Sequence, residues 1–399
     1  MGASGKNQQQ SLTMNNTLAN ECIKHPLKGA ICVNELDELE ALVILSCMES
    51  IGSIKIRQLL QVFGSALSAL LADPSEIASL PGFGQKIVSQ WTLWKNDHRW
   101  KTNLALADKE KVQIVPITSA AYPKKLLELP DPPIILYVKG DITLIKSKCI
   151  AIVGTRQASI YGNETAKQFA KELASMGYVI LSGLARGIDT SAHIGALESG
   201  TTAAVIGSGL SDIYPAENRL LADKIGNMGC LISEFPMATP PDRQNFPQRN
   251  RIVSALSLGI VLIEAPIKSG AMITMNNGRA MGKKLFVLPG RIDGNFGGNH
   301  SLLKSGQAQL VESAEEIAQS FDDLFGGGQK APPKAKMRIP LDKEEAELLQ
   351  LLPTEEIAIE EIVLRTKLPM AVLNVLLMSL VLKGAIKEFP GKVYKKQVS

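Results

Sequence analysis

The chain of 399 residues has few cysteines and histidines, and this limits what it can crosslink or coordinate. The five cysteines are an odd number without a C-x-x-C spacing, and only four histidines are present to share in a metal site. We therefore expect reduced thiols, a cytoplasmic location and no bound metal. The cysteines are Cys22, Cys32, Cys47, Cys149 and Cys230.

Signals for a membrane are also missing. No run approaches the roughly 18 apolar residues of a transmembrane helix. The first residues, MGASGKNQQQSLTMNN, contain neither the apolar core of a signal peptide nor a serine or threonine where a myristoylation motif places it. We expect neither secretion nor membrane anchoring.

The excess of positive over negative charge is also small. Lys and Arg number 43 against 39 Asp and Glu, and the formal net charge of +4 permits a polyanionic partner without requiring one. The hydrophobic content of 45% is ordinary for a soluble protein with packed cores, and the length suits about two or three domains. The placement of the cations therefore matters more than their number.

The first part of the chain predicts a tail and a helical module. Residues 1–38 are polar and aperiodic, which is typical of a disordered tail. From 39 to about 110 the apolar spacing is helical, with glycine-containing breaks at 50–54 and 80–88. The second break, LPGFGQKIV, resembles the hairpin of a helix-hairpin-helix motif, whose glycines bring backbone N–H groups close to a phosphate. A small helical bundle that uses its glycine turns only for packing fits the same short pattern.

From Lys148 onward the chain repeats strand–loop–helix units. The strand candidates are continuous apolar runs, and amphipathic segments such as 163–177 lie between them. This pattern is typical of parallel strands buried on both faces, so we predict a doubly wound α/β domain over 111–325. The predicted strands are 149–154, 178–183, 202–209, 230–235, 259–266, 284–290 and 308–313.

The last part predicts a linker and a winged helix. Residues 326–340 combine glycine, proline and lysine without an apolar period, which is typical of a flexible linker. Over 341–399, three helices near 342–352, 357–366 and 369–383 precede a short β-hairpin. The third helix is nearly all apolar, which argues against direct reading of a DNA major groove.

Candidate site residues follow the strands, because ligands of a doubly wound sheet bind outside the carboxyl ends of its strands. Glycines, hydroxyls, amides and cations gather there, and no acid–base set competes with them. In chain order the candidates are Gly154, Thr155, Arg156, Ser159, Gly183, Arg186, Gly187, Gly207, Gly209, Asn218, Phe246, Arg249, Asn250, Arg251, Lys268, Ser269 and Gly270. Tyr161 and Tyr214 are further candidate ring faces.

Two nucleotide motifs and one catalytic pair do not fit. A dinucleotide site needs G-x-G-x-x-G after the first strand, where this chain has Gly154 alone, and GRAMGKK has the wrong spacing for a Walker A loop. Asp189 and His193, four residues apart on one helix, suggest a helix N-cap and a packed histidine more than a catalytic dyad, because no nucleophile accompanies them. We expect no cofactor and no enzyme activity.

The arginines point to an anion. Arg156, Arg186, Arg249 and Arg251 fall at one sheet edge, and the sequence places few carboxylates near them. Because an arginine is rarely buried without a partner, we expect an anion from outside. Phosphate contacts beside exposed rings are typical of single-stranded nucleic acid binding.

Six loops together resemble the bacterial DNA-processing protein A family (DprA/Smf). They are VGTRQASIYG, LSGLARGIDTSAH, GSGLSDIYPAEN, SEFPMATPPDRQNFPQRNRIVSALS, VLIEAPIKSGAMIT and LFVLPG, and YPKKLLELPDPPIILYVKGD at 122–141 also matches. The resemblance runs from about Val115 to about Glu315. The sequence departs from the family at Ala271-Met272 and at Lys283, where Ser-Leu and arginine are more common.

The resemblance implies a cytoplasmic, non-enzymatic protein with an extended Rossmann-like fold. Such proteins bind single-stranded DNA, dimerise, protect incoming DNA and help to load a RecA-type recombinase during natural transformation and recombination. By the same resemblance, Gly154-Thr155-Arg156 hold a phosphate and the FPQRNR arginines line the same basic pocket.

Two other functions remain open on the residues alone. Nucleotide hydrolases related to the lysine-decarboxylase-like family have a similar sheet, but their PGGxGTxxE loop is replaced here by EAPIKSGAMIT, with Glu264 and no second glutamate. A purely structural scaffold would leave the arginines without a role.

Overall fold

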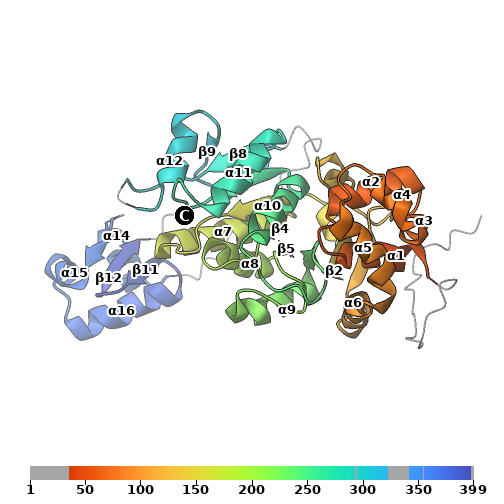
Figure 1. The fold of residues 1–399 in the computed structure, drawn as a ribbon. Coiled ribbons are helices and arrows are strands. Elements are labelled where there is room, and N and C mark those ends of the chain that lie inside the picture. The colour runs from red at the N-terminus through yellow and green to blue at the C-terminus, as the bar shows by residue number, and fades with distance from the viewer. Residues whose placement is uncertain (1–35, 293, 322–340, 354, 397–399) are drawn as a thin grey trace, which may run out of the picture. The chain divides into compact units, whose positions relative to one another are not determined.

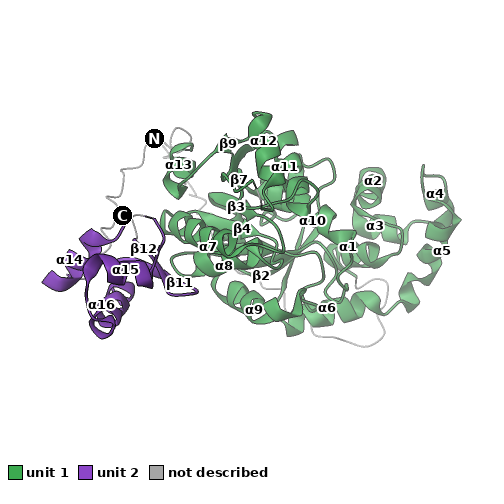
Figure 2. Cartoon of the chain, turned by 90° about the vertical axis from the view of Figure 1, so that its left-hand side faces the viewer, with its two compact units in different colours: residues 1–321 green, residues 322–399 purple. Residues whose placement is uncertain are grey.

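The computed structural model describes residues 36–292, 294–321, 341–353 and 355–396. The predicted tail lies outside these residues apart from 36–38, and the predicted linker at 326–340 lies outside them entirely. The chain divides into two compact units, residues 1–321 and 322–399, which we describe separately (Figure 2). The boundary predicted near residue 110, within the first unit, stays a prediction.

The first unit begins with a cluster of helices, as the helical spacing predicts. Asp37 and Glu40 form a capping box that starts the first helix. Each glycine-containing break ends at a glycine N-cap, Gly52 or Gly84, which has no side chain to cap the next helix. The helices are α1 (Glu38–Cys47), α2 (Ser53–Phe63), α3 (Ala66–Leu71), α4 (Pro74–Ala78), α5 (Gln85–Leu93) and α6 (Arg99–Lys109). Figure 1 shows them in red to orange.

A nine-stranded sheet forms the centre of this unit, in the order β1-β2-β6-β5-β4-β3-β7-β8-β9. The apolar runs correctly predict the seven parallel strands, which confirms the doubly wound α/β fold. They are β3 (Cys149–Val153), β4 (Val179–Ser182), β5 (Thr202–Val205), β6 (Cys230–Ser233), β7 (Gly259–Leu262), β8 (Lys284–Val287) and β9 (Gln309–Leu310). The prediction missed β1 (Gln113–Pro116) and β2 (Ile135–Gly140), which extend the sheet with antiparallel pairing beside β6.

Helices cover both faces of the sheet because successive strand residues point to opposite sides. Ile150 and Ile152 pack with α7, α8 and α13, whereas Ala151 and Val153 share a core with α10, α11 and α12. The helices are α7 (Ile160–Ser175), α8 (Ile188–Leu197), α9 (Arg219–Met228), α10 (Asn245–Leu256), α11 (Gly270–Ala280), α12 (Gly297–Lys304) and α13 (Ala314–Gln319). Short 3-10 turns are η2 (Trp94–Asn96), η3 (Lys124–Glu128), η4 (Ile142–Lys146) and η5 (Ala216–Asn218).

Buried hydrogen bonds join the N-terminal helices to the sheet. Asn103 on α6 donates from Nδ2 to the hydroxyl of Tyr137 on β2, at 2.7 Å, and its Oδ1 accepts from the backbone N–H of Met237, at 2.6 Å. Trp100, Tyr137 and Ile206 belong to one continuous core. The helical cluster is therefore packed against β2, near the β1 edge of the sheet.

The second unit has the order of elements that the sequence predicts for a winged helix. Its helices are α14 (Lys343–Leu351), α15 (Ile359–Thr366) and α16 (Met370–Leu382), and its hairpin is β11 (Ile386–Phe389) with β12 (Val393–Lys396). The prediction missed β10 (Ile357–Ala358), which pairs antiparallel with β12. No single helix among the described residues is long and apolar enough to span a membrane; only α15 and α16 together reach that length and composition, and they are bent by 114°.

Candidate nucleic-acid interface

The candidate site lies where the order of the strands reverses. β3 pairs in parallel with β4 on one side and with β7 on the other, and Figure 2 shows β3 between β7 and β4. At such a point the loops that leave neighbouring strands part toward opposite faces and open a crevice. We use the name rim for the surface formed by the loops that follow β3, β4, β5, β6, β7 and β8.

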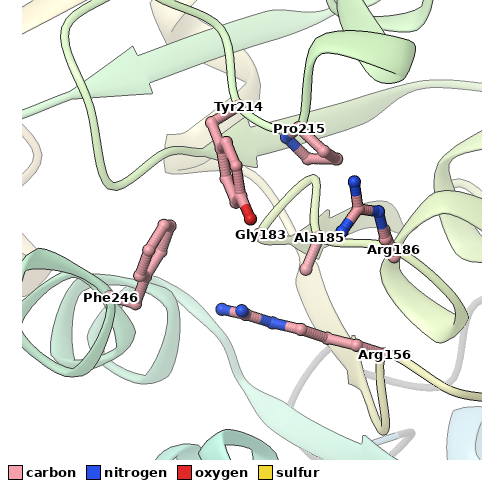
Figure 3. Close-up of a pocket in the computed structure, with 7 residues that line it drawn as sticks. All are labelled: Arg156, Gly183, Ala185, Arg186, Tyr214, Pro215 and Phe246. Atoms are coloured by element: carbon pink, nitrogen blue, oxygen red, sulfur yellow. The ribbon is translucent and has the colours of Figure 1, made fainter. Parts of the chain in front are cut away.

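One pocket in the rim combines a cation with two aromatic rings (Figure 3). The guanidinium carbon of Arg156 lies 4.9 Å from the centre of the Phe246 ring, and the Tyr214 and Phe246 ring centres are 5.7 Å apart. A guanidinium can bind a phosphate while a ring stacks on a base, so the arrangement suits a nucleotide unit. The pocket is lined by Arg156, Gly183, Ala185, Arg186, Tyr214, Pro215 and Phe246.

Arg156 is the cation of this pocket that is free to bind an anion. Its side chain is exposed and points toward Phe246, and no carboxylate of the described residues forms an ion pair with it. The backbone of its loop is less available, because the Thr155 N–H donates to the Glu264 carbonyl at 2.7 Å. The Gln157 N–H donates to the Thr155 hydroxyl at 3.2 Å. These two N–H groups therefore already have partners, and the Arg156 side chain is the exposed cationic donor of this loop.

The expectation that few carboxylates lie near the other arginines is wrong. Arg186 forms an exposed ion pair with Glu217 from the loop after β5, and its Nη2 lies 3.1 Å from Glu217 Oε2. Arg251 pairs with Glu234, which follows β6, and has Asp131 at 4.0 Å. Burial raises the pKa of Glu234 to about 7 despite this arginine. These two arginines have internal partners, and their DNA contacts stay predictions.

Arg249 lies beneath the pocket instead of at its edge. The residue is buried, and its Nη1 donates to the carbonyl of Val205 at the end of β5. Burial lowers its pKa to about 10, while the nearby Asp189 carboxylate favours its charged form. A Cβ on Gly183 would collide with this guanidinium, so Gly183 is glycine because Arg249 packs directly on its backbone. Arg249 thus supports the floor of the pocket.

The predicted glycines bring the loops of the rim close together. Gly187 has φ +73°, and a Cβ there would strike the Thr155 carbonyl, so glycine is required where the loops after β3 and β4 meet. A Cβ on Gly154 would strike Ile188, and one on Gly207 would strike the Phe246 ring. A Cβ on Gly209 would strike the backbone at Met237. These residues shape the site through packing.

Several predicted polar residues are hydrogen-bonded within the protein. Ser159 caps α7, and its N–H and hydroxyl both donate to the buried Glu264 carboxylate, at 3.0 and 2.6 Å. Asn218 Nδ2 donates to the Leu184 carbonyl at 2.9 Å, and Asn250 Nδ2 to the Gly270 carbonyl at 3.2 Å. Ser269 caps α11 by accepting from the Met272 N–H at 3.4 Å. Their DNA contacts stay predictions, and fewer of their hydrogen-bonding groups are available to DNA.

The structure separates the candidate ring faces. Tyr161 packs beside Phe296, with ring centres 6.4 Å apart, and is not among the residues that line the pocket of Tyr214.

Sequence reasoning missed Arg243, an exposed cation just before α10 that forms no ion pair with a described residue. Its position three residues before Phe246 was the available signal.

Asp189 and His193 both have hydrogen-bond partners within the protein, which confirms the packed histidine, whereas the prediction that Asp189 is a helix N-cap is wrong. Asp189 accepts from the backbone N–H groups of Gly183 and Ala185, at 3.0 and 3.3 Å, although the N-cap of α8 is Gly187. His193 Nδ1 lies 2.7 Å from the Thr202 hydroxyl, which itself donates to the Ile180 carbonyl. The histidine must therefore donate from Nδ1, which leaves its buried Nε2 without a partner.

This buried histidine predicts an acid-sensitive fold. Burial lowers the pKa of His193 from 6.5 to about 3, so its neutral form contributes stability above pH 6.5 that is lost as the pH falls toward 3. Between pH 7 and pH 5 the loss is about 2 kcal/mol. We expect the parent to lose this much free energy of unfolding relative to His193→Leu when the pH is lowered from 7 to 5. Urea titrations of both proteins at the two pH values measure the change. A difference that does not change with pH contradicts the assignment.

Comparisons with known proteins agree with this fold and these loops. The family model for DNA recombination-mediator protein A matches residues 113–322, and that for the DprA winged helix domain matches 331–392. DNA processing protein DprA of Bacillus subtilis is 40% identical over 224 residues, which cover 55% of this chain and 74% of that protein. Protein Smf of Escherichia coli is 36% identical over 302 residues, or 73% and 79% of the two chains.

Solved structures extend the comparison. The X-ray structure of DprA from Streptococcus pneumoniae matches with a TM-score of 0.61 and 32% identity, covering 71% of this chain and 98% of that one. A structure of DNA processing protein A from Helicobacter pylori, which concerns the single-stranded DNA binding mode of that protein, matches with a TM-score of 0.50 and 33% identity. It covers 54% of this chain and 98% of that one. By its loops, its fold and these matches, the chain belongs to the DprA/Smf family of DNA-processing proteins.

Proposed function

We propose that this protein binds single-stranded DNA at the rim, without catalysis and without a cofactor. The observation that carries the proposal is Arg156, an exposed arginine with no ion-pair partner among the described residues, held 4.9 Å from the Phe246 ring and in one pocket with Tyr214. A phosphate bound by Arg156 would leave the attached base close to two ring faces. Single strands present bases to rings in this way, and duplexes do not.

Membership of the family supports a proposal for the cellular role. We infer that the protein acts as a homodimer in the cytoplasm, protects incoming single strands and helps to load a RecA-type recombinase during natural transformation and recombination. The described cysteines, Cys47, Cys149 and Cys230, are free thiols, which suits a reducing compartment.

The purified protein is expected to bind single-stranded oligonucleotides more tightly than duplexes, with little preference for sequence. The reason is a pocket that offers an arginine and rings but no element that reads a groove. Affinity should fall as salt rises, with a log–log slope of about −0.7 for each phosphate neutralised. Fluorescence anisotropy over a salt series measures both effects. Equal affinity for the two forms of DNA, or an affinity insensitive to salt, counts against the proposal.

The same preparation tests the alternative function, a nucleotide hydrolase. Glu264, the carboxylate in the loop where such enzymes carry a catalytic glutamate, is buried and hydrogen-bonded to Ser159. Release of a free base from a nucleoside monophosphate would favour the hydrolase over DNA binding. We expect no release above that of a buffer control.

A further inference from the structure

The rim has a second, apolar half on the other side of β3. Tyr161, in the first turn of α7, is 52% exposed, Ile267, after β7, is 62% exposed, and Ile292, after β8, is 96% exposed. Their loops adjoin because β3, β7 and β8 pair in parallel. We use the name apolar half-rim for Ile160, Tyr161, Ile267 and Ile292.

The two central side chains of the apolar half-rim are supported from below. The Tyr161 ring lies against Phe296, which is buried, and Ile267 lies over Gly297, where an added Cβ would come within 3.1 Å of Ile267 Cγ1. Tyr161 and Ile267 are thus held at the surface by the start of α12. Contiguous apolar patches at a protein surface mark binding surfaces.

A cation lies beside the apolar half-rim, and the exposed carboxylate of Glu164 follows Tyr161 by three residues in α7. Lys268 is exposed next to Ile267 and has no ion-pair partner among the described residues. In the described parts of the three loops the only carboxylate is Glu264, which is 2% exposed and accepts hydrogen bonds from Ser159. A ligand here meets a cation, a half-exposed aromatic ring and aliphatic surface, which is the combination that suits a phosphate with its base.

One loop connects the apolar half-rim to the pocket of Arg156. Residues 154–159 leave β3, place Arg156 against Phe246, and enter α7, whose second residue is Tyr161. A DNA strand whose phosphate is bound by Arg156 would therefore next meet the Tyr161 ring and the Lys268 ammonium group on the other side of β3. This continuity favours the same ligand on both halves.

We propose that single-stranded DNA continues from the pocket onto the apolar half-rim, with a base stacked on Tyr161 and a backbone phosphate at Lys268. The inference rests on the proposed function and extends it from one pocket to a track over both halves of the carboxyl edge. Ile267 and Ile292 provide apolar contact to the bases that follow.

The test compares two lengths of oligonucleotide on the full chain. A strand of about 4 nucleotides occupies the pocket alone, whereas one of about 20 nucleotides also covers the apolar half-rim. We expect the double variant Tyr161→Ala/Lys268→Ala to bind the long strand about tenfold or more weakly than the parent and the short strand equally well. Tyr161→Phe keeps the stacking face and should bind both lengths like the parent, while thermal melting confirms that each variant is folded.

Photocrosslinking provides a second measurement. A 20-mer that carries 5-iododeoxyuridine at successive positions is expected to crosslink to Tyr161 in the parent and to lose that crosslink in Tyr161→Ala. The inference is overturned if the folded double variant binds both lengths like the parent, or if it loses both lengths equally. Failure of the parent to bind either length would instead refute the proposed function itself.

Discussion

Replacing Arg156 with alanine is expected to weaken the binding of single-stranded DNA about tenfold or more. Arg156 is the pocket cation without a carboxylate partner among the described residues, so its positive charge is available to a phosphate. A charge-assisted hydrogen bond contributes roughly 1.5–3 kcal/mol, and each 1.4 kcal/mol is about a factor of ten in affinity. Anisotropy titrations at fixed salt measure the change.

The matched control for this substitution is Lys304→Ala, which also removes one exposed positive charge. Lys304 ends α12, whose other end lies at the rim, so it is at the far end of that helix. We expect little change in DNA affinity for this control and an unchanged melting temperature for both variants. If Arg156→Ala is folded and binds like the parent, the pocket has been assigned to the wrong residues.

Replacing Arg249 with methionine should lower the free energy of unfolding by about 1–3 kcal/mol, because it leaves a buried carbonyl without its donor and removes positive charge near the buried carboxylate of Asp189. Burial raises the pKa of Asp189, and Arg249 is the charge that opposes this increase. The carbonyl that loses its donor is that of Val205. Urea unfolding at neutral pH measures the loss.

Two further variants show whether the charge pair is the cause. Arg186→Met removes an arginine whose ion pair with Glu217 is exposed, and it should change stability little. The double variant Arg249→Met/Asp189→Asn should recover part of the lost stability, since no buried charge is then left alone. Equal stability of Arg249→Met and the parent would show that the buried arginine is dispensable.

Most of the fold could be predicted from the sequence because the central strands are buried on both faces. β3 and β7 consist entirely of buried residues, so their apolar runs stand out against the amphipathic helices. β1 has four residues and ends at Pro116, and β10 has two, so neither is long enough to show the hydrophobic pattern of a strand. β2 is a longer apolar run, but without its antiparallel partners it looks like any buried segment.

The site was predicted less well because ion pairs join residues from different loops. Arg186 and Glu217 are 31 residues apart, and Arg251 and Glu234 are 17 apart, so no local pattern reveals either pair. Arg249 is different. It precedes the buried residues Ile252, Val253 and Leu256 at helical spacings of three, four and seven, and this period indicates the buried face of α10. The sequence therefore contained a signal that Arg249 lies inside.

The carboxylate of Glu264 occupies a position that other doubly wound folds use for a phosphate. In doubly wound folds that bind nucleotides, the start of the helix after the first parallel strand receives a phosphate. Here that position, at Ser159 before α7, already holds a covalently attached anion. A phosphate at this position would have to displace the Glu264 carboxylate from Ser159 and approach its negative charge. A phosphate bound by side chains on the neighbouring loops, such as Arg156, does not compete with Glu264.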